Sequence, residues 1–223
     1  MQRIDSNDLI AVIDDESDLA ADITVKDYSS DITHLVNKVE MTTKTKATIE
    51  LIKKLVSENK KTIVWCIFIS SIKQLENLCK QHGIKVKCIY GEIALEDRLK
   101  LIDQFRNGEI DVLITNPHTL AESVSLHTVC HDAIYYEYSF NLVHLLQSKD
   151  RIHRLGLEDG QYTQYYFMNN YYIYNEQPIS IADRIYTRLK EKEQTMLNAI
   201  NNDILEHVTS YEEDLEIIFS ELT

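Results

Sequence analysis

The chain has 223 residues, enough for one domain with appendages, and its hydrophobic fraction of 44% is ordinary for a globular protein. Its net charge of −13 and pI near 5.0 argue against a generally basic coat for nucleic acid, although a local basic groove can coexist with acidic flanks. The start is polar and acidic, unlike a signal peptide, and no apolar run approaches the roughly 20 residues of a membrane-spanning helix. We therefore expect a soluble cytoplasmic protein with no membrane partner.

Strands and helices alternate behind an acidic lead over residues 1–40. Runs of strand length predict strands at 61–69, 84–90, 111–115, 133–138 and 162–168. Apolar residues at helical spacing predict helices at 41–57, 72–82, 95–105 and 143–154. This alternation predicts right-handed βαβ units, and hence a three-layer α/β domain with a parallel sheet over residues 41–170.

The remainder, residues 171–223, is predicted to be a C-terminal helical extension. A loop is expected over 169–178, followed by two or three helices with apolar residues at helical spacing. The tyrosines around the last strand could form a platform for stacking bases. Packing at the sheet edge with hydrated hydroxyls is the simpler interpretation.

The cysteines and histidines show no metal-ligand pattern. No C-x-x-C pair occurs among the four cysteines, and their apolar surroundings indicate reduced thiols in the core: Cys66, Cys79, Cys88 and Cys130. His118, His127 and His131 lie near Cys130 in the sequence, but their spacing matches no standard zinc site. We therefore expect no bound metal on this chain alone.

Polar residues and glycine follow several of the predicted strands. These are Ser70, Ser71, Gly91, Thr115 and Asn116. Because ligands gather at the carboxyl ends of parallel strands, we expect these residues to contact nucleic acid, with a phosphate at the helix N-terminus after the first strand. The simpler alternatives are that the two serines only cap that helix and that the threonine is a turn hydroxyl.

Two arginines stand three residues apart in the run from Gln147 to Gly156. On the predicted helix, Arg151 and Arg154 would project from one face, suited to hold a phosphate chain across a cleft. Because they follow the fourth strand, we expect them to line the same edge of the domain as the polar residues above. The alternative is a pair of surface arginines in salt bridges, while His153 is expected to be a packed or capping histidine.

This run resembles motif VI of superfamily-two helicases, most closely the Swi/Snf-type translocases. Further resemblances follow in the family's order, over about residues 44–168. Lys61 to Ser71 is similar to motif IV, Tyr90-Gly91-Glu92 with Arg98 and Phe105 to the next block, and Val112 to Thr115 to the opening of motif V. The resemblance implies a RecA-like second lobe of an ATP motor, in which Arg154 is the finger toward the γ-phosphate. Arg151 then makes a second phosphate contact, and Gln147 orients the pair.

The sequence departs from the family in motif V. Where the Swi/Snf pattern has several glycines, this chain has Ala121 to His127, with Glu122, Ser123 and Ser125 inside the run. These three residues are the expected nucleotide-binding positions, although the free backbone geometry of glycine is lost there. Asn116-Pro117-His118 and the residues after Leu126 resemble a bacterial branch of the family.

The chain contains no G-x-x-x-x-G-K-[ST] loop to cradle phosphates. The resemblance therefore implies ATP and Mg²⁺ only when an N-terminal helicase lobe, in the same longer chain or a separate one, completes the site. We expect no hydrolysis by this lobe alone, and movement along double-stranded DNA by the complete motor. Two alternatives remain: a non-catalytic helicase-like scaffold that binds protein or nucleic acid, and an unrelated nucleotide-binding α/β domain.

Overall fold

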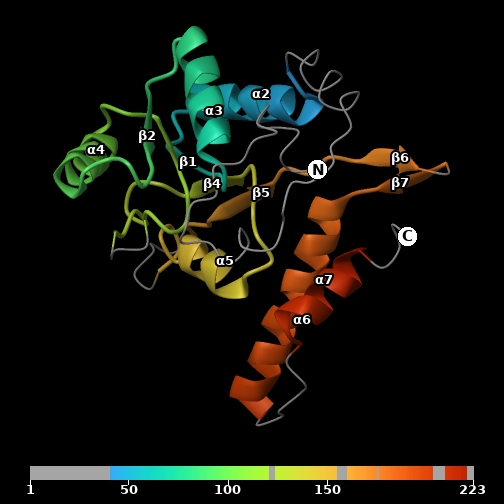
Figure 1. Cartoon of the computed structure of the whole chain (residues 1–223). Coiled ribbons are helices and arrows are strands. Elements are labelled where there is room, and N and C mark those ends of the chain that lie inside the picture. Colours follow the sequence, from blue (N-terminus) through green and yellow to red (C-terminus); the bar gives the residue numbers. More distant parts are fainter. Residues whose placement is uncertain (1–40, 121–123, 155–159, 175, 203–208, 220–223) are drawn as a thin grey trace.

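The computed structural model describes residues 41–120, 124–154, 160–174, 176–202 and 209–219 (Figure 1). The predicted acidic lead, Glu122, Ser123 and Gly156 lie outside these residues. The described elements are α2 (Thr43–Ser57), β1 (Thr62–Trp65), α3 (Ile69–Gln81), β2 (Val86–Ile89), α4 (Leu95–Asn107), β3 (Val112–Thr115), β4 (Asp132–Tyr135), α5 (Leu142–Lys149), β5 (Gln164–Phe167), β6 (Tyr172–Tyr174), β7 (Gln177–Ile179), α6 (Ile181–Asn202) and α7 (Tyr211–Phe219).

The central sheet has five strands in the order β2-β3-β1-β4-β5, and every neighbouring pair is parallel. The prediction of a parallel sheet is confirmed. Its register aligns the last residue of each strand in one row: Ile89, Thr115, Trp65, Tyr135 and Phe167. The segments that follow these five strands therefore all begin at the same edge of the sheet, the carboxyl edge.

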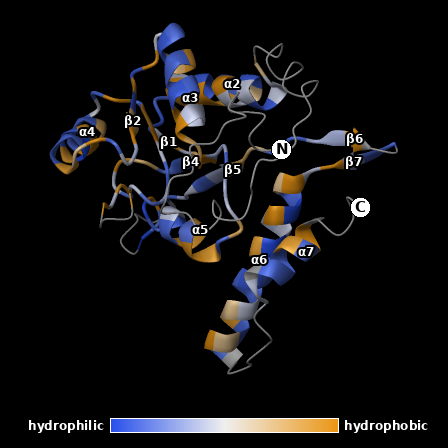
Figure 2. Cartoon of the chain, viewed as in Figure 1, coloured by the Kyte–Doolittle hydropathy of each residue, from blue (hydrophilic) through white to orange (hydrophobic). Residues whose placement is uncertain are grey.

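Side chains that alternate along each strand divide the core into two layers. In β1, Val64 packs with the apolar faces of α2 and α3, while Ile63 and Trp65 pack with α4, α5 and α6 on the opposite face. Figure 1 shows α2 and α3 above the sheet and α5 below it. Hydrophobic and hydrophilic residues are interspersed along these helices (Figure 2), and their buried apolar residues pack with the strands. The three-layer α/β prediction is thus confirmed.

The prediction of a loop over residues 169–178 is wrong. Tyr172–Tyr174 and Gln177–Ile179 pair as an antiparallel hairpin, β6 and β7, beside the long helix α6 (Figure 1). Two or three helices were expected after it, and the described residues contain two, α6 and α7. None of the described helices is long and apolar enough to cross a membrane.

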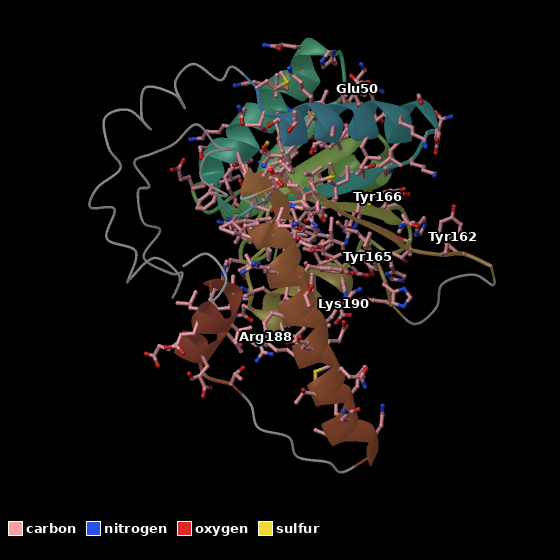
Figure 3. All side chains as sticks on the ribbon, turned by 90° about the vertical axis from the view of Figure 1, so that its right-hand side faces the viewer. Glu50, Tyr162, Tyr165, Tyr166, Arg188 and Lys190 are labelled. Atoms are coloured by element: carbon pink, nitrogen blue, oxygen red, sulfur yellow. The ribbon has the colours of Figure 1, made fainter. Side chains whose placement is uncertain are left out.

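Buried charges join α6 to α7. Asp214 of α7 is 1% exposed and accepts hydrogen bonds from Arg188 Nε at 2.9 Å, from Thr209 Oγ1 at 2.8 Å and from Lys192 Nζ. Figure 3 shows Arg188 on the α6 ribbon and Tyr165 and Tyr166 nearer the sheet. Burial would raise the pKa of Asp214, but these hydrogen bonds and the Lys192 charge lower it overall. Within the extension, α7 is therefore held on α6 by charge as well as by apolar packing.

Two helix boundaries differ from prediction. Helix α3 begins at Ile69 with Phe68 as its N-cap, which makes no capping hydrogen bond of its own, so the expected capping by Ser70 and Ser71 is wrong. Helix α5 ends at Lys149 rather than at 154, with Asp150 as its C-cap. Arg151 and Arg154 thus lie in the turn after the helix, and they do not share a helical face.

Candidate functional site

The residues after β3 lie at the carboxyl edge, with their polar groups partly engaged within the chain. Thr115 is buried and its hydroxyl donates to the Asn116 carbonyl at 3.3 Å. The Asn116 side chain accepts from the Thr119 N–H at 3.1 Å and so shapes the turn that follows β3. After β2, Gly91 is exposed and its carbonyl accepts from Arg98 Nη2 at 2.8 Å. The structure therefore brings the expected nucleic-acid residues to one edge.

The N-terminus of α3 at this edge already holds an anion from the chain itself. Glu137, two residues beyond β4, accepts from the Ile67 and Phe68 N–H groups at 3.0 and 3.1 Å, and from the Ser71 hydroxyl at 2.6 Å. Ser71 is fully buried, whereas Ser70 is partly exposed. A carboxylate thus occupies the position where the sequence predicted a bound phosphate.

Glu137 belongs to a buried polar group that the sequence reasoning missed. Lys44 of α2 is 4% exposed and its ammonium lies 4.5 Å from the centre of the Tyr136 ring. Thr45 and the Tyr136 hydroxyl share a buried hydrogen bond of 2.9 Å. Burial raises the pKa of Glu137 overall, although the Lys44 charge and the three hydrogen bonds lower it. The signal in the sequence was a single carboxylate within the apolar run 133–140.

The candidate phosphate-contacting arginines lie in the turn after α5. Arg151 is 8% exposed, whereas Arg154 is exposed and its Nε donates to the Asp150 carbonyl at 3.0 Å. Burial lowers the pKa of Arg151, and the neighbouring Arg154 charge lowers it further. Gln147 is exposed on α5. The positive charges of the two arginines therefore disfavour each other.

The described part of motif V packs against this turn. The Leu126 N–H donates to the Arg151 carbonyl at 2.7 Å, and Leu126 itself is fully buried. Just before it, the Ser125 carbonyl accepts from Arg106 at 3.1 Å, and the Ser125 hydroxyl lies 2.5 Å from His127 Nδ1. The backbone next to Ser125 is thus hydrogen-bonded to the backbone of Arg151.

The arginines do not lie at the polar carboxyl edge, contrary to the expectation from the sequence. Thr163 immediately precedes β5, and its hydroxyl contacts the Ile152 carbonyl at 3.4 Å and His153 Nδ1 at 3.3 Å. The arginine turn therefore lies beside the amino end of β5, while Asn116 and Ser70 follow the carboxyl ends of their strands. The physical reason is that α5 runs back along the sheet after β4. His153 is exposed, and this contact with Thr163 lies at the surface.

The tyrosines of β5 are engaged in packing. Tyr166 donates to Asp132 at 3.1 Å, and the Tyr165 hydroxyl contacts the Lys149 carbonyl at 3.5 Å. Tyr162, just before the strand, is 69% exposed (Figure 3). Two of these three tyrosines therefore follow the packing interpretation rather than that of a stacking platform.

Known proteins resemble the chain over the region that holds both sets of residues. The model of the helicase conserved C-terminal domain matches residues 43–156. The ATP-dependent RNA helicase DBP3 of Kluyveromyces lactis is 26% identical over 137 residues, which is 60% of this chain and 25% of that protein. DBP3 of Saccharomyces cerevisiae is 24% identical over 128 residues, 56% of this chain and 23% of that protein.

A solved structure shares the fold. The crystal structure of the C-terminal part of the Fun30 ATPase domain superposes with a TM-score of 0.57 at 19% identity, covering 80% of this chain and 53% of that one. The chain spans about a quarter of the length of the two DBP3 relatives. The family model, by contrast, covers half of this chain and includes the motif V and motif VI segments. The chain therefore belongs to the helicase conserved C-terminal domain family and forms the C-terminal RecA-like lobe of a superfamily-two helicase.

Proposed function

We propose that this chain is the second motor lobe of an ATP-dependent helicase or translocase and acts with an N-terminal lobe. The observation that carries the proposal is the contact between motif V and motif VI, in which Leu126 hydrogen-bonds the Arg151 carbonyl within the family-matched region. This contact fixes the turn that carries both arginines. ATP bound by a partner lobe would then face positive charge that is already in position.

The positive charge of the arginine turn is complementary to the negative phosphate chain of a nucleotide. Arg151 is held in place by burial, while Arg154 is exposed and donates to the Asp150 carbonyl, so its guanidinium can be redirected. Under the proposal, Arg154 stabilises charge that develops on the transferred phosphate, and Arg151 contacts the phosphate chain. Gln147, exposed one turn earlier, would orient the pair. A finger of this kind contributes on the order of a thousandfold in rate.

Under this proposal, the residues that bind Mg²⁺ do not come from this lobe. Among the residues that the structure describes, no group of three or more His, Cys, Asp or Glu side chains could hold a metal ion. We therefore assign the protein ligands of Mg²⁺ to the first lobe, together with the loop that cradles the phosphates. When bound there, the metal would neutralise charge on the β- and γ-phosphates.

Nucleic acid is proposed to bind at the carboxyl edge, through Ser70, Gly91 and Asn116. Double-stranded DNA is the proposed track, because the motif VI run resembles the Swi/Snf-type translocases and because the fold matches part of the Fun30 ATPase domain. RNA is the second candidate, since the curated relatives bear the name RNA helicase. A scaffold that binds nucleic acid without turnover is the alternative to a motor.

The test uses the intact native protein that carries this chain. Its ATP hydrolysis is measured alone, with duplex DNA and with single-stranded RNA. Stimulation by duplex DNA supports the proposed track, and stimulation by RNA alone would replace it with the second candidate. Nucleic-acid binding without any ATP turnover would overturn the motor and leave the scaffold.

A further inference from the structure

Two oppositely charged side chains are buried together at the carboxyl edge. Glu137 is 1% exposed and Lys44 is 4% exposed, and they come from the segment after β4 and from α2. Ionised groups are costly to bury unless they are paired and hydrogen-bonded. Here the carboxylate has three donors and feels the positive charge of Lys44. Apolar packing alone does not explain this site, because a leucine would pack equally well there.

The three donors to Glu137 all lie in one short segment. Ile67 and Phe68 give backbone N–H groups and Ser71 gives its hydroxyl, so one carboxylate spans the whole turn from β1 into α3. Helix N-termini carry partial positive charge and attract anions. Glu137 satisfies that charge from inside the core. The turn is thereby closed to a nucleic-acid phosphate at its inner face, and Ser70 remains as its partly exposed hydroxyl.

We propose that Glu137, supported by Lys44, is a positioning residue for nucleic-acid binding, because its carboxylate holds the turn from Ile67 to Ser71 in the orientation that presents Ser70 at the carboxyl edge. This inference rests on the proposed function. It adds that the chain fills its own helix N-terminus with an internal anion. The nucleic acid is then contacted from the outer face of the turn.

A matched control lies one residue away on each element. Thr45 follows Lys44, and Tyr136 precedes Glu137. Their hydroxyls share a buried hydrogen bond of 2.9 Å that does not touch the turn. Thr45→Val removes this buried hydrogen bond from the same cluster and should lower the Tm by several degrees. It therefore measures the effect of destabilisation without loss of the internal anion.

The first experiment compares Glu137→Gln with Thr45→Val in the full chain. Binding of a short fluorescein-labelled DNA duplex and of a single-stranded RNA is followed by anisotropy, and the Tm of each variant is recorded. The glutamine amide can still accept from the two N–H groups, but its NH₂ cannot accept from Ser71. We expect roughly tenfold weaker binding for Glu137→Gln, as for one lost hydrogen bond to a charged group. Thr45→Val should bind as the wild type does.

The second experiment asks whether a carboxylate holds the turn, whatever the chain binds. Glu137→Ala opens a space lined by three donors, so sodium formate should raise its Tm more than sodium chloride at matched ionic strength. Formate should leave the Tm of the wild type unchanged. If Glu137→Ala does not fold in either salt, the binding comparison with Glu137→Gln decides.

The outcomes separate the two claims. Wild-type affinity in Glu137→Gln overturns the positioning role, and so does an equal loss of affinity in Thr45→Val, which would reflect general destabilisation. A wild-type chain that binds neither probe overturns the proposed nucleic-acid edge instead. In that case the formate experiment alone shows whether Glu137 holds the turn, and equal effects of formate and chloride reject it.

Discussion

Replacing Arg151 with alanine should destabilise the fold, whereas the same change at Arg154 should not. The Arg151 side chain is 8% exposed, so alanine removes two buried methylenes worth about 0.8 kcal/mol each and leaves a small cavity. The expected cost is about 2 kcal/mol, equivalent to a fall in Tm of roughly 4 to 8 °C for a chain of this size. Exposed Arg154 should stay within about 0.5 kcal/mol of the wild type.

Thermal unfolding of the two variants, followed by circular dichroism, measures this difference. Arg151→Met serves as a third variant, because it keeps the buried stem and removes a charge that burial and Arg154 both disfavour. Its Tm should lie between those of the wild type and Arg151→Ala. Equal losses of Tm in Arg151→Ala and Arg154→Ala would refute the view that only Arg151 is anchored in the fold.

Two further predictions concern the docked extension and the thiols. Asp214→Asn should lower the free energy of unfolding by about 2 kcal/mol at neutral pH, since Arg188 and Lys192 lose a buried partner. The folded pKa of Asp214 is lowered, so its contribution is present above its unfolded value near 3.8 and is lost as pH falls through the folded pKa. Denaturant unfolding of both proteins at neutral pH and below pH 3.8 should show the difference closing; a constant difference would contradict the ion-pair account. Burial raises the pKa of Cys79 and Cys130 to about 12, so a thiol reagent at mildly alkaline pH should label the native chain far more slowly than the unfolded chain; equal rates would show that these thiols are accessible.

The sheet could be predicted because its strands are buried on both faces and read as apolar runs. The hairpin β6–β7 could not, since Tyr171 and Ile173 are exposed and the segment has the polar-aromatic composition of a loop. The order of the strands, with β1 in the centre, was not predicted either. It depends on contacts between segments that lie far apart in the sequence.

The sequence yields candidate residues for the site, but it does not predict their arrangement. Beyond the end of α5, the Arg151 carbonyl accepts from Leu126 of the motif V segment. The cap of α3 comes from Glu137, which lies 69 residues beyond Phe68. Both are tertiary hydrogen bonds, and local patterns of charge and apolar spacing carry no information on them.

The central claim is that this lobe supplies arginine charge to ATP held by a first lobe. The most direct measurement is nucleic-acid-stimulated ATP hydrolysis by the intact native protein, compared with its Arg154→Ala variant and with Lys100→Ala, an exposed cation on α4, as the control. Arg154→Ala should lower kcat on the order of a thousandfold at unchanged Tm, with Lys100→Ala near the wild type. Turnover by Arg154→Ala within about tenfold of the wild type would contradict the claim.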